Sequence, residues 1–194
     1  MKIDKKLNLV TNITREDGAI VYLHVTPFPY EVVEEHCLLL GNLFTNFISQ
    51  VGGLGAARVA AMMLRKKLQR EQELRDESNQ HAPTIVDEIQ RLTSVVWNDG
   101  GTWKTTSFDV AMKQGIISSD EYREVEGEVV FFMVSSAIQK AHLIAPTVGT
   151  VIGMFGGQLE SLSVTAFRDS LQTSNPVTDT QSPDAQQETS FIPS

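Results

Sequence analysis

The first part of the chain alternates between apolar and polar residues. The alternation runs through residues 7–14 and 19–26, which are rich in Val, Ile and Thr, and a short polar segment with a glycine separates them. A period of two places every second side chain on one face of a strand, so the pattern predicts a β-hairpin over about residues 7–27. Pro27 and Pro29 cannot donate to a sheet ladder and should end the second strand.

After the hairpin the apolar residues recur every three or four positions, which is the spacing of an amphipathic helix. The expected helices cover residues 30–49, 56–76, 83 to a stop at 98–101, 108–114, and a long helix that begins at Ser118 and is interrupted at Pro146. Residues 158–171 complete the body. The sequence therefore predicts an α+β protein, predominantly α-helical, in which an N-terminal β-hairpin is followed by about five or six helices.

The long helix has the clearest start signal. Ser118 and Glu121 have the spacing of a capping box, in which each side chain bonds the backbone amide of the other residue. Glu121, Glu124 and Glu128 recur at helical spacing, and we expect them on one solvated face rather than as an acid and base pair.

The composition changes sharply near the end of the chain. Residues 172–194 contain no Lys or Arg, are rich in Pro, Ser, Thr and Gln, and carry large apolar residues only at Phe191 and Ile192. Such a segment buries too little apolar surface to offset the entropy of ordering it. We expect a single globular domain over residues 1–171 and a disordered tail over residues 172–194, in which Phe191 and Ile192 could dock.

Charge and cysteine content narrow the class of protein. The net charge is −8, which argues against nucleic acid as the main partner. Cys37 is the single cysteine and falls in an apolar helical pattern, so we expect a small buried side chain in a reducing compartment. The N-terminus has no secretory signal pattern, and we expect a cytoplasmic protein.

The sequence carries no motif that assigns a catalytic, cofactor, metal or small-molecule site. The four histidines are scattered and lack the spacing of a zinc site, and no Gly-x-Ser-x-Gly motif occurs. We therefore expect a protein that is not an enzyme. The competing interpretation is a small enzyme whose site is assembled from dispersed residues such as His24, Glu34 and Asp109, which a deep polar pocket joining them would favour.

Small residues recur every four positions in the apolar run after residue 143. These are Ala145, Gly149, Gly153 and Gly157. On a helix they form a strip that a second helix can approach closely, either inside the monomer or in self-association. The run is too short, and too broken by Pro146, to cross a bilayer.

Several segments together resemble the tail assembly chaperones of long-tailed, siphovirus-type bacteriophages. The similarity lies in general pattern and involves the segments at 5–10, 25–27, 57–65, 115–121 running into 129–132, and the closing 190–194. The resemblance implies a non-catalytic protein of the host cytoplasm that binds and solubilises the tape measure protein, recruits tail tube subunits and is absent from the mature virion. It also implies a longer product, made by ribosomal frameshifting near the end of the short reading frame, in which a linker to an extra domain begins in the tail. The alternative is a minor tail or neck protein that stays in the virion.

Overall fold

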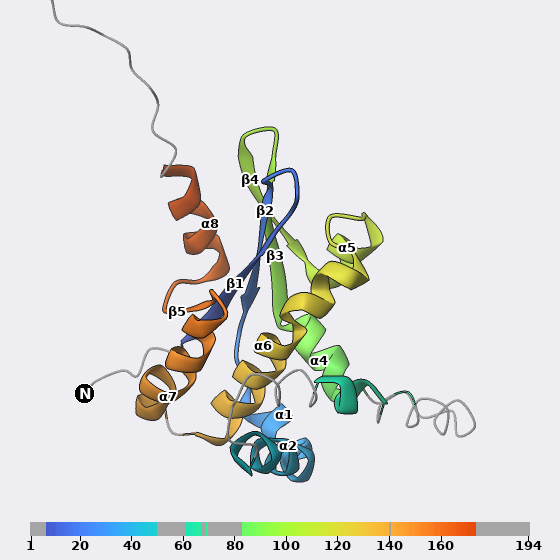
Figure 1. Cartoon of the computed structure of the whole chain (residues 1–194), viewed down its shortest axis with the longest axis vertical. Helices are drawn as coiled ribbons and strands as arrows, with labels where there is room; N and C mark the ends of the chain where they lie inside the picture. Colours follow the sequence, from blue (N-terminus) through green and yellow to red (C-terminus); the bar gives the residue numbers. More distant parts are fainter. Residues whose placement is uncertain (1–6, 50–60, 67–68, 70–82, 140, 174–194) are drawn as a thin grey trace, which may run out of the picture.

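The computed structural model describes residues 7–49, 61–66, 69, 83–139 and 141–173. A five-stranded antiparallel sheet lies at its centre, with strand order β4-β3-β2-β1-β5 (Figure 1). The strands are β1 (Asn8–Thr14), β2 (Ile20–Val25), β3 (Thr93–Asp99), β4 (Thr102–Ser107) and β5 (Gln158–Glu160). The helices are α1 (Tyr30–Glu35), α2 (Cys37–Ser49), α4 (Ile85–Arg91), α5 (Phe108–Lys113), α6 (Ser119–Ile138), α7 (Ala141–Met154) and α8 (Val164–Thr173), and residues 61–66 are also helical.

The sheet has helices on both faces. Alternate strand residues, such as Leu9 and Leu23, face the main core, where α6 packs against β1 and α2. The opposite face holds a smaller cluster of Val10, Val96 and Phe167, and Phe167 comes from α8, which packs on β3 and β4. Because both faces are covered, the strands carry apolar residues on two sides.

The prediction of a lone N-terminal hairpin followed by helices is wrong, because β3, β4 and β5 extend the sheet. The helix expected from Pro83 ends at Arg91, and Thr93 begins a strand. Of the residues 98–101 that we expected to stop a helix, Asn98 and Asp99 end β3, and Gly100 and Gly101 form the turn of the β3–β4 hairpin. Gly100 and Gly101 have φ of 59° and 93°, which suits a two-residue hairpin turn.

Three local expectations also need correction. The helix expected over residues 30–49 is divided at His36 into α1 and α2. Cys37, which we expected to be buried, is exposed at the start of α2. Pro146 lies inside α7, whereas the break between α6 and α7 comes earlier, after Ile138. Pro146 is the sixth residue of α7, so it removes the amide that would otherwise bond the carbonyl oxygen of His142.

Other predictions from the sequence are confirmed. Strands β1 and β2 pair as an antiparallel hairpin, with Leu9 opposite Val25 and Thr14 opposite Ile20. At the start of α6 the Ser118 hydroxyl accepts from the Glu121 amide, and the Glu121 carboxylate accepts from the Ser118 amide. The capping box thus fixes the first turn of the helix that crosses the sheet.

Candidate functional site

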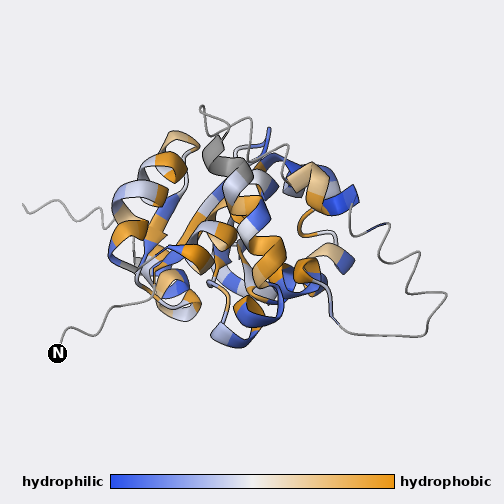
Figure 2. Cartoon of the chain, turned by 90° about the horizontal axis from the view of Figure 1, so that it is seen from below, coloured by the Kyte–Doolittle hydropathy of each residue, from blue (hydrophilic) through white to orange (hydrophobic). Residues whose placement is uncertain are grey.

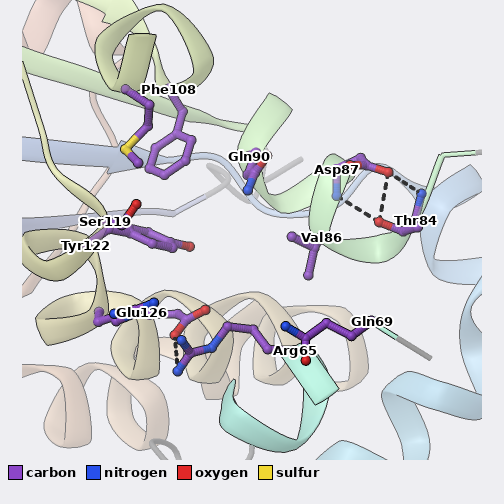
Figure 3. Close-up of a pocket in the computed structure, with 12 residues that line it drawn as sticks. Arg65, Gln69, Thr84, Val86, Asp87, Gln90, Phe108, Ser119, Tyr122 and Glu126 are labelled. Carbon is purple, nitrogen blue, oxygen red and sulfur yellow. Dashed lines mark hydrogen bonds and ion pairs between the residues drawn. The ribbon is translucent and has the colours of Figure 1, made fainter. Parts of the chain in front are cut away.

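A recess of about 390 Å³ opens between α4, α5 and α6 (Figure 3). One wall is apolar, because the rings of Phe108 and Tyr122 meet edge to face there with centroids 4.7 Å apart; Met112 and Val86 also line the recess. We call this cavity the α4–α6 recess. Its position follows from local sequence signals, because the capping box of Thr84 and Asp87 begins α4, as that of Ser118 begins α6.

One turn further along α6, the α4–α6 recess holds a partly buried ion pair. Glu126 on α6 is 8% exposed, and its Oε2 lies 3.1 Å from Nη2 of Arg65 in the 61–66 helix. Burial raises the pKa of the Glu126 carboxyl, and the charges of Arg65 and Arg123 act in the opposite direction. Arg65 Nε is buried with no hydrogen-bond partner among the described residues. The pair therefore places a charged group beside an aromatic wall.

The chemistry available in the recess is that of binding. Its acidic groups are committed to structural partners: Glu126 to Arg65, and Asp87 to the capping box with Thr84. Within the described residues, no group of three or more His, Cys, Asp or Glu side chains is placed to hold a metal ion. An apolar wall beside paired charges suits an amphipathic peptide side chain better than a reacting small molecule.

A second carboxylate of α6 is buried against the sheet. Glu128 is 6% exposed, and Thr11 Oγ1 on β1 donates to its Oε2 at 2.7 Å. Burial raises the pKa of Glu128 to about 7, although the bond from Thr11 lowers it. The expectation that Glu128 is solvated is therefore wrong. Glu121, by contrast, pairs with Arg15 at 2.6 Å, and this hydrogen bond lowers its pKa to about 2.

The sequence contains a signal that would have indicated this burial. Residues 129–134 of α6 are all apolar, so no side of the helix at this point can be a wholly polar face. A helix that is apolar on all sides is covered by other elements on several sides. Carboxylates within one turn of such a segment are then also covered. The spacing of the carboxylates along the chain does not by itself reveal that Glu126 and Glu128 are buried.

The three residues that the enzyme interpretation requires do not line the α4–α6 recess. His24 is buried in β2, where its Nε2 lies 3.0 Å from the carbonyl oxygen of Leu162, and burial lowers its pKa. Glu34 on α1 and Asp109 on α5 are exposed. None of the three lines the α4–α6 recess. The structure of the described residues therefore does not bring these side chains together in that cavity.

Some residues of the small-residue strip pack against other parts of the protein, whereas others are exposed to solvent. Ala145, Gly149 and Gly153 lie on α7, whereas Gly157 follows the end of that helix. A Cβ added to Gly149 would lie 3.2 Å from Leu159 Cδ1, so this glycine lets α7 approach β5 closely. Ala145 and Gly153 are exposed. The other proposed contact residues, Phe191 and Ile192, lie outside the described residues.

Large apolar side chains are exposed on three helices that pack in sequence, α2 on α6 and α6 on α7. Leu38 on α2 is 83% exposed, Ile138 at the end of α6 is 41% exposed and Leu143 near the start of α7 is 42% exposed. These three elements lie together at the lower end of the molecule in Figure 1. Figure 2 views the molecule from this end and shows hydrophobic residues on the helices there. We call Leu38, Ile138 and Leu143 the lower apolar surface.

Comparisons with known proteins add no assignment. No family model, curated protein or solved structure matches this chain. Among the described residues, no helix is both long enough and apolar enough to span a bilayer. The candidate sites of this protein are therefore defined by its own geometry: the α4–α6 recess and the lower apolar surface.

Proposed function

We propose that this protein is a tail assembly chaperone of a long-tailed bacteriophage. It binds helical segments of the tape measure protein in the host cytoplasm, keeps that client soluble and helps to recruit tail tube subunits, without catalysis and without remaining in the virion. The observation that carries the proposal is the lower apolar surface, because exposed leucine and isoleucine side chains on neighbouring helices offer a place for the apolar face of a client helix.

The charge of the chain fits this role. A net charge of −8 keeps a complex with a long apolar client soluble through repulsion between loaded molecules. The capture of a client helix needs a few apolar anchors on a rigid support rather than a reactive group. Leu38 and Ile138 meet this need, because α2 and α6 pack against each other and hold both side chains at the surface.

Co-expression with a tape measure protein tests the proposal. The wild-type chain should raise the soluble fraction of the client, and the double variant Leu38→Glu with Leu143→Glu should lose this effect because each carboxylate opposes apolar contact. Val110→Glu is the matched control, since Val110 is also apolar and 40% exposed but lies on α5. No increase in client solubility with the wild-type chain, or equal loss with Val110→Glu, would contradict the proposal.

A further inference from the structure

A second cavity, of about 700 Å³, lies at the other end of the sheet, between the β1–β2 and β3–β4 hairpins. Its apolar lining includes Ile20, Trp97, Trp103 and Ile116. We call it the hairpin cleft. The cleft exists because β2 and β3 stop pairing at Val21 and Trp97, whereas β3 and β4 stay paired to the tip of their own hairpin.

The two tryptophans of the hairpin cleft are held in place. Trp97 Nε1 donates to Thr106 Oγ1 at 3.2 Å, and the ammonium group of Lys104 lies 5.7 Å from the Trp97 ring centroid. The Trp103 ring packs against Tyr22 with centroids 5.6 Å apart. Ile20 is 36% exposed. Because Trp97 pairs with Lys104 and Trp103 with Asn98, the two rings lie on opposite faces of the hairpin, and they line the cleft from the main-core face and the α8 face respectively.

The last described helix ends beside this lining. α8 packs along β4, and Gln172 Nε2 donates to the carbonyl oxygen of Trp103 at 3.2 Å. Figure 1 shows α8 ending at the same end of the sheet as the two hairpin turns. The residues that follow Thr173 therefore start next to a wall of the hairpin cleft.

We propose that Phe191 and Ile192 of the same chain occupy the hairpin cleft. About 18 residues separate Phe191 from Thr173, and a coil of that length has a typical end-to-end distance of roughly 23 Å. Because the helix before this segment ends beside Trp103, which lines the cleft, a coil of this length can reach the cleft. A segment tethered in this way has an effective concentration on the order of millimolar, which favours it over an untethered partner.

The chemistry of the segment fits the cleft. Phe191 and Ile192 are adjacent large apolar residues, and Val177 is the one branched aliphatic residue in the stretch from 174 to 190 before them. An aromatic ring beside either tryptophan gains from edge-to-face contact as well as from burial. The proposal does not depend on the function proposed above, because it concerns the opposite end of the molecule and a segment of the chain itself.

Intrinsic fluorescence provides a direct test, because Trp97 and Trp103 are the two tryptophans of the chain and both line the cleft. In the full-length protein, the double variant Phe191→Ala with Ile192→Ala should shift the emission to longer wavelength and increase quenching by acrylamide. Val177→Ala is the matched control and should leave both signals unchanged. Identical spectra and quenching for the wild type and the double variant would overturn the proposal.

A second measurement distinguishes the occupants. With Cys37→Ser in the background, Ser190→Cys carries a fluorescent acceptor that receives energy from the tryptophans. Transfer that is strong, independent of protein concentration and reduced by Ile20→Glu supports docking within one chain. Transfer that rises with protein concentration would show that a second copy is the occupant, and absence of transfer would show that the segment stays away from the cleft. Either result would refute the proposal.

Discussion

The buried carboxyl of Glu128 should make the stability of the protein depend on pH. Its pKa rises from the ordinary value of 4.5 to about 7 in the folded state because burial disfavours the charged form. A raised folded-state pKa means that the folded protein is more stable when the Glu128 carboxyl is protonated than when it is ionised. The stabilisation relative to the ionised form is fully present below pH 4.5 and is lost as the pH rises through about 7.

The size of this effect follows from the shift. One pKa unit corresponds to about 1.4 kcal/mol, so the wild-type free energy of unfolding should lose about 3 kcal/mol from this group between pH 4.5 and pH 8. Glu128→Gln replaces the carboxyl with a neutral amide whose oxygen can still accept from Thr11 Oγ1. The variant should therefore lack this contribution, and its stability relative to the wild type should increase with pH.

Urea denaturation of the wild type and Glu128→Gln at several pH values measures the difference directly. Contributions from His24, Glu121 and Glu126 are present in both proteins and cancel in the difference. Glu124→Gln, on the exposed side of α6, is the control and should give a curve parallel to the wild type. If the curve of Glu128→Gln is also parallel to the wild type, then the account of a carboxyl desolvated between α6 and β1 is refuted.

The remaining predictions concern the N-cap of α6 and two glycines. Ser118→Ala removes the hydroxyl that accepts from the Glu121 amide and should cost about 1 kcal/mol of unfolding free energy, whereas Ser119→Ala next to it should have little effect; equal losses would contradict the capping role. Gly157→Ala places a Cβ 2.8 Å from Ile152 Cγ2 and 3.0 Å from Glu128 Oε2, so we expect a loss of about 1–3 kcal/mol. Gly153→Ala has open space within α7 and should instead stabilise by about 0.5–1 kcal/mol; the same thermal and urea melts check both, and a stabilising Gly157→Ala would be inconsistent with the packing described.

The sequence predicts the elements whose signals are local. The capping box at Ser118 and the alternation in β1 and β2 depend on neighbouring residues, and both predictions are confirmed. Strand β3 was missed because Ile85, Ile89, Leu92 and Val96 also fit a helical spacing, and β4, its partner, lies in residues 102–107, for which no element was expected. The β-branched run from Thr93 and the Asp99–Gly100–Gly101 turn signal compete with that spacing, and pairing with β2 decides in favour of the strand.

The candidate sites were less predictable than the fold. β5 has three residues, too few for a period of two to be recognised, and it is a strand because β1 offers an unpaired edge. The α4–α6 recess joins Arg65, Phe108 and Glu126 from three helices, and spacing along the chain does not reveal such proximity. The small-residue strip on α7 was visible in the sequence, but only the structure shows that Gly149 serves contact with β5.

The small cluster on the second face of the sheet has a consequence for folding cooperativity. In the described part of the chain, α8 contributes one buried side chain, Phe167, and the partly buried Val164 and Leu171 to this cluster. A helix attached by so few apolar contacts can separate from the sheet at a lower free energy than global unfolding. The amides of α8 should then exchange with solvent hydrogen before those of α6, and Val10 and Val96 would become transiently accessible in a protein whose main core is still intact.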